Sequence, residues 1–168
     1  MSVFGKLDLL PRVSLAHTPT PIERLDNLSK ALDGGHLYVK RDDCTGMAMG
    51  GNKARQLEYY FGEAVQQDAD TILITGAVQS NFVRMAAAAA AKLDLACHIQ
   101  LEERVNDIGA NYRDSGNVLL DHILGATIHT YPDGEDEAGA DANLQSIANE
   151  LRSAGKRPYI IPLAMGHP

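Results

Sequence analysis

The chain has 168 residues, enough for one domain with its own hydrophobic core or for one domain and part of another. Hydrophobic residues make up 45% and charged residues 22% of the chain, which is the ordinary range for a globular protein. The net charge of −7, from 22 acidic and 15 basic residues, argues against nucleic acid and against a membrane surface as the main partner.

The first elements along the chain are irregular. Thr20 is a residue type that caps helices, and apolar residues then recur at helical spacing until a glycine pair, so we predict a helix over 22–32. Residues 36–40 are typical of a short strand. Residues 41–52 form a polar, glycine-rich and methionine-rich stretch that we expect to be a loop.

From residue 53 onward, the pattern alternates between helices and strands. We predict helices over 53–67, 80–93, 112–124 and 137–153, and strands over 71–75, 96–101, 126–130 and 158–162. Short connections between them are typical of parallel βαβ units. The strands are continuous apolar runs, as expected when helices cover both faces of a sheet. The predicted fold class is therefore α/β, with a doubly wound parallel sheet of Rossmann-like units.

Cysteine and histidine patterns give no metal or disulfide signal. Cys44 and Cys97 lie far apart in no CxxC pattern, and the six histidines form no HxH or HxxxH pattern. No apolar run reaches the roughly 18 residues that a membrane span needs, and the N-terminal stretch carries Asp8 and Pro11, unlike a signal peptide. We therefore expect a cytoplasmic protein with reduced cysteines and no metal.

Lys53 is the residue that the sequence singles out first. Ligands of open α/β sheets bind where the carboxyl ends of strands lead into helices. Of the six lysines, only Lys53 follows a glycine pair, Gly50-Gly51, at a predicted helix start. The positive end of the helix dipole disfavours the charged amine, and a neutral amine can form a Schiff base with an aldehyde. The alternative is a solvated lysine after a turn, which the spacing alone favours.

Ser80 and Asn81 mark a second candidate position, where a predicted strand leads into a helix. A hydroxyl and an amide at a helix start can hold an anion such as a carboxylate, together with the backbone N–H groups. The alternative is ordinary helix capping, which these residue types perform widely.

Asp42 and Asp43 are adjacent carboxylates in the loop before the glycine pair. They could suggest a metal pair, but no further ligands follow at a useful spacing. We expect them to be structural and to pair with Lys40 or Arg41.

Four ordered strings give a more specific signal than any single residue. They are KRDD at 40–43, GGNKxR at 50–55, GAxQSN at 76–81 and SGNxLLD at 115–121. In this order and spacing they resemble the family of D-cysteine desulfhydrase and 1-aminocyclopropane-1-carboxylate deaminase. Those proteins are pyridoxal-phosphate enzymes of the tryptophan-synthase-β-like fold, fold type II. The resemblance runs from about Thr18 to the end of the chain.

The resemblance implies roles for individual residues. Lys53 and Ser80 would be catalytic, with Lys53 binding pyridoxal 5'-phosphate covalently and moving the substrate's α-proton, and Ser80 holding the substrate carboxylate. Asn81 would bond the cofactor's 3-hydroxyl oxygen and line the substrate site, and Asn52 would also line the cofactor pocket. Phe82 would shape the substrate pocket, where the family commonly has His or Gln. The reaction would be β-elimination or ring opening with release of ammonia.

Substrate identity stays open between several readings. Residues 47–51 are similar to the D-cysteine desulfhydrase branch, so a lyase that converts D-cysteine to pyruvate, sulfide and ammonia is the first expectation. The stretch 111–122 is also similar to relatives that act on L-cysteate, and deamination of 1-aminocyclopropane-1-carboxylate is a further alternative.

Gln56 stands where the family often has a basic residue. The uncharged Gln56 side chain would weaken binding of the cofactor's phosphate. A reading of another class is a non-catalytic Rossmann-like domain that binds an anion or a second polypeptide.

Domain organisation also follows from the resemblance. Residues 1–49 would belong to the larger cofactor domain, 50–163 would form the smaller α/β domain, and 164–168 would begin the link back. Relatives continue past the position of Pro168, so we expect this chain to be a fragment that is inactive alone. Apolar surface left exposed in the N-terminal part predicts a homodimer, other self-association, or a complementing C-terminal half.

Overall fold

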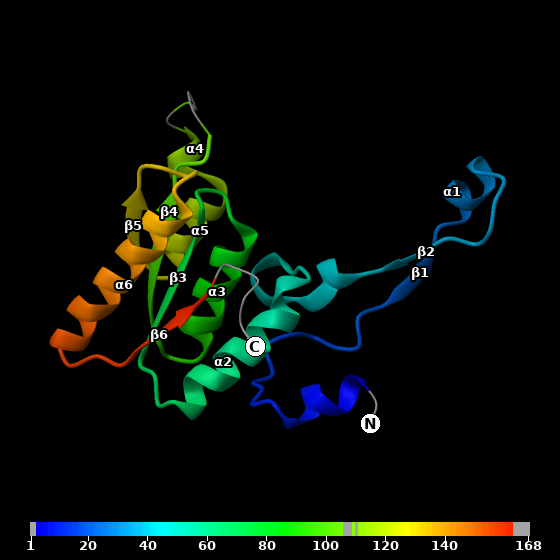
Figure 1. Ribbon diagram of the computed structural model, residues 1–168. Helices are drawn as coiled ribbons and strands as arrows, with labels where there is room; N and C mark the ends of the chain where they lie inside the picture. The colour runs from blue at the N-terminus through cyan, green and yellow to red at the C-terminus, as the bar shows by residue number, and fades with distance from the viewer. Residues whose placement is uncertain (1–2, 106–108, 110, 163–168) are drawn as a thin grey trace.

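A computed structural model describes residues 3–105, 109 and 111–162 of the chain. Figure 1 shows an extended N-terminal part that leads into a layered α/β unit. The predicted link over 164–168 lies outside the described residues, and the predicted domain boundary after residue 49 stays a prediction. Among the described residues, no helix is both long and apolar enough to cross a membrane.

A four-stranded parallel sheet forms the centre of the α/β unit. Its strand order is β5-β4-β3-β6. The strands are β3 (Thr71–Ala77), β4 (Ala96–Glu102), β5 (Thr127–Tyr131) and β6 (Pro158–Ile161). The chain runs outward from β3 through β4 to β5 and then returns to the other side of β3. The switch point of the topology therefore lies between β3 and β6, and such sheets bind ligands there, beyond the carboxyl ends of the strands.

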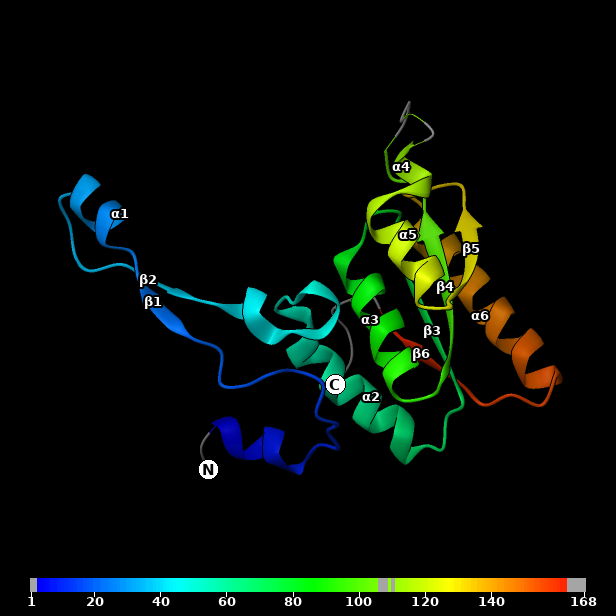
Figure 2. The same cartoon turned by 180° about the vertical axis from the view of Figure 1, so that it is seen from behind.

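Helices cover both faces of this sheet, as the two opposite views show (Figures 1 and 2). The helices are α2 (Lys53–Gln66), α3 (Asn81–Lys92), α4 (Asn111–Asp114), α5 (Gly116–Ile123) and α6 (Glu137–Ser153). The main core joins α2, α3 and α5 to one face, with Phe61 and Ile74 fully buried. On the other face, Leu73 packs against Leu144 and Ala148 of α6. The predicted doubly wound α/β fold is confirmed.

The single helix predicted over 112–124 is wrong, because the structure breaks it into α4 and α5. Gly116 lies at the break with φ +59°. A Cβ on Gly116 would lie 2.5 Å from Oε1 of Gln79, and this same oxygen accepts a hydrogen bond from the backbone N–H of Asn117 at 2.8 Å. The turn before α3, which carries Gln79, therefore lies too close to residue 116 for one continuous helix to pass there.

The helix predicted over 22–32 is wrong in its first part. Strand β1 (Ile22–Arg24) runs antiparallel to β2 (Tyr38–Lys40), and α1 covers only Asp26–Ala31. Thr20 does not cap a helix, because its hydroxyl donates to Oδ1 of Asp42 at 2.9 Å. A long-range contact thus overrides the local helix signal.

Three short 3₁₀ helices complete the N-terminal part: η1 (Val3–Leu9), η2 (Asp42–Thr45) and η3 (Met47–Met49). Two of them lie in the stretch over 41–52 that the sequence predicts to be a loop. Both views show β1, α1 and β2 as an arm that projects away from the α/β unit (Figures 1 and 2). The arm exposes large apolar side chains, namely Ile22, Leu28, Leu32 and Tyr38.

Candidate active site

A cavity of about 500 Å³ opens at the carboxyl end of β3. The side chains and backbone that line it are those of Lys53, Gln56, Gly76, Ala77, Ser80, Phe82, Arg104 and Pro162. Gly76 and Ala77 end β3, and Pro162 directly follows β6. The cavity therefore lies at the switch point between these strands, and its volume is that of a small-molecule site.

Lys53 is the first residue of α2 and reaches this cavity. Its Nζ lies 5.7 Å from the centroid of the Phe82 ring, in a cation–π contact. The Lys53 side chain is exposed, so water reaches the amine at the mouth of the cavity. The structure thus brings Lys53 next to the start of α3, where Ser80 and Phe82 lie.

Ser80 both caps α3 and lines the cavity. Its Oγ accepts a hydrogen bond from the backbone N–H of Val83 at 3.3 Å. The hydroxyl proton remains available to a ligand while Oγ accepts this bond. Capping and anion binding, the two interpretations of Ser80, are therefore compatible in one geometry.

Asn81 is held by two neighbours through its side-chain oxygen. Oδ1 accepts from Nη1 of Arg84 at 2.8 Å and from Nδ2 of Asn117 at 3.1 Å. Among the described residues, Nδ2 of Asn81 has no hydrogen-bond partner, which leaves a donor for a ligand oxygen. Asn81 and Asn52 are both exposed and lie outside the set of residues that line the cavity.

Arg84 is a residue that the sequence reasoning missed. It is buried in α3, and its Nη1 also donates to Oδ1 of Asn117 at 2.7 Å, so it ties the turn before α3 to the start of α5. Its counter-charge is Asp121, which is fully buried, with both carboxylate oxygens unpaired among the described residues. Burial raises the pKa of Asp121 to about 7, and the positive charge of Arg84 offsets part of that shift. An arginine within the apolar stretch of α3 was the signal for this pair.

Gln79 makes a second connection between the same segments. Its Nε2 donates to the carbonyl oxygens of Tyr112 at 2.6 Å and Ser115 at 3.0 Å. Nδ2 of Asn117 donates back to the carbonyl oxygen of Gln79 at 2.7 Å. The GAxQSN and SGNxLLD strings are therefore one hydrogen-bonded unit beside the cavity.

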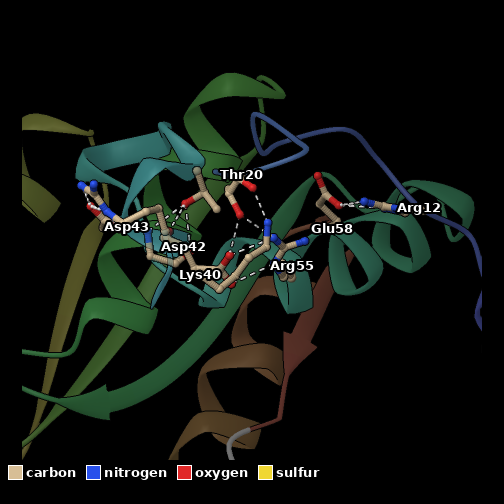
Figure 3. Close-up of polar contacts among 10 residues, drawn as sticks. Arg12, Thr20, Lys40, Asp42, Asp43, Arg55 and Glu58 are labelled. Atoms are coloured by element: carbon tan, nitrogen blue, oxygen red, sulfur yellow. Dashed lines mark hydrogen bonds and ion pairs between the residues drawn. The ribbon is translucent and has the colours of Figure 1, made fainter. Parts of the chain in front are cut away.

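Ionic contacts join Arg55, in the first turn of α2, to Asp42 in the stretch before that helix (Figure 3). Arg55 donates to both carboxylate oxygens of Asp42, at 2.8 and 2.9 Å, and Thr20 donates to one of them. The hydrogen bond from Arg55, followed by that from Thr20, lowers the pKa of Asp42 to about 2. The predicted pairing of Asp43 with Arg41 is confirmed, at 2.6 Å. For Asp42 the predicted partner was wrong, because Arg55 from the next helix reaches it.

Comparison with known proteins agrees with this geometry. The family described as "Pyridoxal-phosphate dependent enzyme" matches residues 13–167. The chain belongs to this family. The predicted membership of a family of pyridoxal-phosphate dependent enzymes, and the cofactor of that family, are therefore confirmed.

Individual relatives extend the comparison. D-cysteine desulfhydrases of Salmonella paratyphi B and Salmonella newport are 43% identical over 157 residues, which cover 94% of this chain and 47% of theirs. A crystal structure of an ACC deaminase homologue is similar with a TM-score of 0.83 and 39% identity, over 95% of this chain and 46% of that one. The chain thus spans about half the length of the relatives it matches.

Lys53 in the cavity and Asn81 outside its lining fit two groups of pyridoxal phosphate, the aldehyde and the ring oxygen. An aldehyde needs an amine, which Lys53 in the cavity supplies. A phenolic ring oxygen needs a donor, and Nδ2 of Asn81, outside the cavity lining, has no partner among the described residues. Gly76 is needed as glycine, because a Cβ there would lie 2.9 Å from Cγ2 of Val83. Gln56 also lines the cavity, and its Nε2 donates to the Tyr60 hydroxyl at 3.2 Å.

Proposed function

We propose that this chain carries the part of the active site that contains the cofactor-binding lysine, Lys53, in a pyridoxal-phosphate dependent lyase. The lyase would act on a small amino acid. The observation that supports this most directly is that Lys53 and Ser80 share one cavity at the switch point of the sheet. D-cysteine is the first substrate we propose, because the relatives quoted above are named D-cysteine desulfhydrase. The products would be pyruvate, hydrogen sulfide and ammonia.

Lys53 and Asn81 would hold the cofactor in this proposal. Bound pyridoxal phosphate supplies an electron sink for the carbon that loses a proton. Nζ of Lys53 accepts the α-proton from the substrate. Because Lys53 lines the cavity, the same amine can later return a proton to the bound molecule. Arg84 keeps Oδ1 of Asn81 occupied, so that the amide presents its N–H group to the ligand.

Ser80 would orient the substrate. Its hydroxyl donates to the substrate carboxylate, and the N-terminus of α3 adds backbone N–H groups and a positive dipole end. Fixing the carboxylate directs the α-hydrogen toward one side of the site. The residues around Ser80 thus determine which stereoisomer presents its α-hydrogen to Lys53.

Two other functions remain as proposals of lower rank. The similar solved structure is that of an ACC deaminase homologue, which supports ring opening of 1-aminocyclopropane-1-carboxylate as an alternative for the same residues. A non-catalytic anion-binding domain would use the Ser80 turn without any covalent use of Lys53. Substrate turnover separates the first alternative, and covalent labelling of Lys53 separates the second.

A chimera tests the proposed function. Because the chain spans 47% of its relatives' length, we expect it to release no pyruvate from D-cysteine by itself. Joining it to the second half of the Salmonella newport enzyme should restore pyruvate release, and Lys53→Ala in the chimera should abolish it. A folded chimera that turns over only 1-aminocyclopropane-1-carboxylate would contradict D-cysteine as the substrate. Pyruvate release by the chain alone would contradict its inactivity.

A further inference from the structure

The charges around the cavity are unusual for so acidic a chain. Of the residues that line it, Lys53 and Arg104 are cationic and none is a carboxylate, although the protein as a whole carries a net charge of −7. A cavity lined by charges of one sign concentrates ligands of the other sign. The lining itself therefore offers two cationic side chains to an anionic group.

Arg104 is held in place by a buried carboxylate behind it. Nε and Nη2 of Arg104 donate to the same oxygen of Glu102, at 3.0 and 2.6 Å. Glu102 ends β4 with its side chain 3% exposed, and its other oxygen accepts from the Thr75 hydroxyl at 2.5 Å. Because burial and the Thr75 hydroxyl hold Glu102 in place, Glu102 in turn holds the guanidinium of Arg104 in one orientation.

The opposite edge of the same guanidinium is free. Within the part of the chain that the structure describes, Nη1 of Arg104 has no hydrogen-bond partner, and the side chain is 35% exposed. The aliphatic part of Arg104 lies against Gly134, where a Cβ would come within 2.5 Å of its Cγ. The aliphatic part of Arg104 is thus held in place, while its Nη1 can donate to a ligand. A residue that binds an anion needs both properties.

We propose that Arg104 is a specificity-determining residue that binds an acidic group on the substrate's β-carbon. In the proposed function the hydroxyl of Ser80 binds the α-carboxylate, so a second anion-binding residue on the same cavity would bind a second acid group. A sulfonate offers several oxygens to the planar guanidinium fork, whereas an uncharged thiol offers no such acceptor. This inference rests on the proposed lyase that acts on a small amino acid, and it replaces D-cysteine as the substrate by a β-sulfonate amino acid such as cysteate.

Binding to the purified chain tests this proposal without turnover. The probes are cysteate and alanine, which share the α-amino acid group and differ in the sulfonate. We expect tighter binding of cysteate than of alanine, measured by NMR titration. Arg104→Met should weaken cysteate binding about 10-fold and leave alanine binding unchanged, because a charge-assisted hydrogen bond is lost. Arg104→Lys should give an intermediate loss, since it keeps the charge without the fork.

Arg113→Met is the matched control. Arg113 is also paired with a glutamate, Glu103 at 2.7 Å, but it does not line the cavity. It should bind cysteate as the wild type does, whereas an equal loss in both variants would show a general charge effect and overturn the proposal. Equal binding of cysteate and alanine by the wild type would also overturn it. Far-UV circular dichroism verifies the fold of each variant.

A separate readout distinguishes this inference from the proposed function. The same samples are incubated with pyridoxal phosphate, and the absorbance band that depends on Lys53 is recorded. A chain with that band but with cysteate binding indifferent to Arg104 retains the proposed function and loses the inference. A chain without the band, in which Arg104 still selects cysteate, retains the acid-group site and loses the proposed function.

Discussion

The carbonyl oxygen of Asp43 lies only 1.8 Å from the position that a Cβ on Gly50 would take. Gly50 has φ +74° and ψ 179°, a conformation essentially restricted to glycine. We predict that Gly50→Ala destabilises the fold by at least about 2 kcal/mol and displaces the turn that carries Lys53. Urea denaturation measures the loss of stability, and cofactor absorbance measures the displacement.

Gly35→Ala is the control for that change. No atom lies within 4 Å of a Cβ on Gly35, and its φ is not positive, so we expect a change within about 0.5 kcal/mol. If Gly50→Ala were as mild as Gly35→Ala, the close approach of Asp43 to Gly50 would be incorrect.

Glu58 attaches the N-terminal segment to α2. Its side chain is buried, with one oxygen accepting the backbone N–H groups of Leu15 and Ala16, both at 2.9 Å, and the other accepting Nε of Arg12 at 2.7 Å. Glu58→Gln should lower the free energy of unfolding by about 2–4 kcal/mol, because a buried acceptor of charged and backbone donors is lost. Glu150→Gln, at an exposed position of α6, should change it little.

The pKa of Glu58 gives this contact a pH dependence. Burial alone would raise it, but the N–H groups of Ala16 and Leu15, together with Arg12, outweigh burial and lower it. A carboxyl with a lowered folded pKa contributes stability that is present above its unfolded value of 4.5 and lost as the pH falls further. Glu58→Gln should therefore reduce the acid sensitivity of the chain, and an unchanged acid-unfolding profile would argue against the contact.

Asp121 should act in the opposite direction. Its pKa is raised from 3.8 to about 7 by burial, so the folded state binds a proton that the unfolded state has lost between these pH values. Stability should therefore fall as the pH rises from about 4 to about 7, by about 2–4 kcal/mol. Asp121→Asn should flatten this decline in melting temperature, and the exposed Asp114→Asn should not. A decline of the same slope in Asp121→Asn would contradict the assignment.

The projecting arm predicts self-association. Ile22 and Leu32 are 66% and 63% exposed on it, and apolar surface of this kind promotes contact between molecules. We expect light scattering to give dimers or larger species whose mass rises with concentration. Ile22→Lys combined with Leu32→Lys should shift the mass toward the monomer, while Val65→Lys on α2 should not. A wild-type monomer at every concentration would disprove this prediction.

Local periodicity predicted the α/β unit well because its helices and strands are stabilised by nearby sequence. The helix over Glu137–Ser153 begins and ends as predicted, and each strand of the sheet lies within two residues of its predicted bounds. The two wrong helix predictions, one of them inside this unit, have long-range causes: Thr20 bonds to Asp42, and Gln79 lies close to Gly116. Such contacts join positions that no local pattern relates.

The candidate site shows the same limit. Lys53 and Ser80 were predictable because each begins a helix at the end where sheets of this class bind ligands. Arg84 gave a signal as an arginine within an apolar helix, but its partners, like those of Arg104, come only from the fold. Arg84 bonds to Asn117 on another helix, and Arg104 lines the cavity only because β4 lies beside β3.

The central claim is that Lys53 is the residue that binds pyridoxal phosphate. Its most direct test is to incubate the chain with the cofactor, record the yellow absorbance band, reduce with borohydride and map the labelled peptide by mass spectrometry. We predict that the label lies on Lys53 and that Lys53→Ala abolishes both band and label, while Lys92→Ala at the far end of α3 retains them. A label on another lysine, or an unchanged band in Lys53→Ala, would contradict the account.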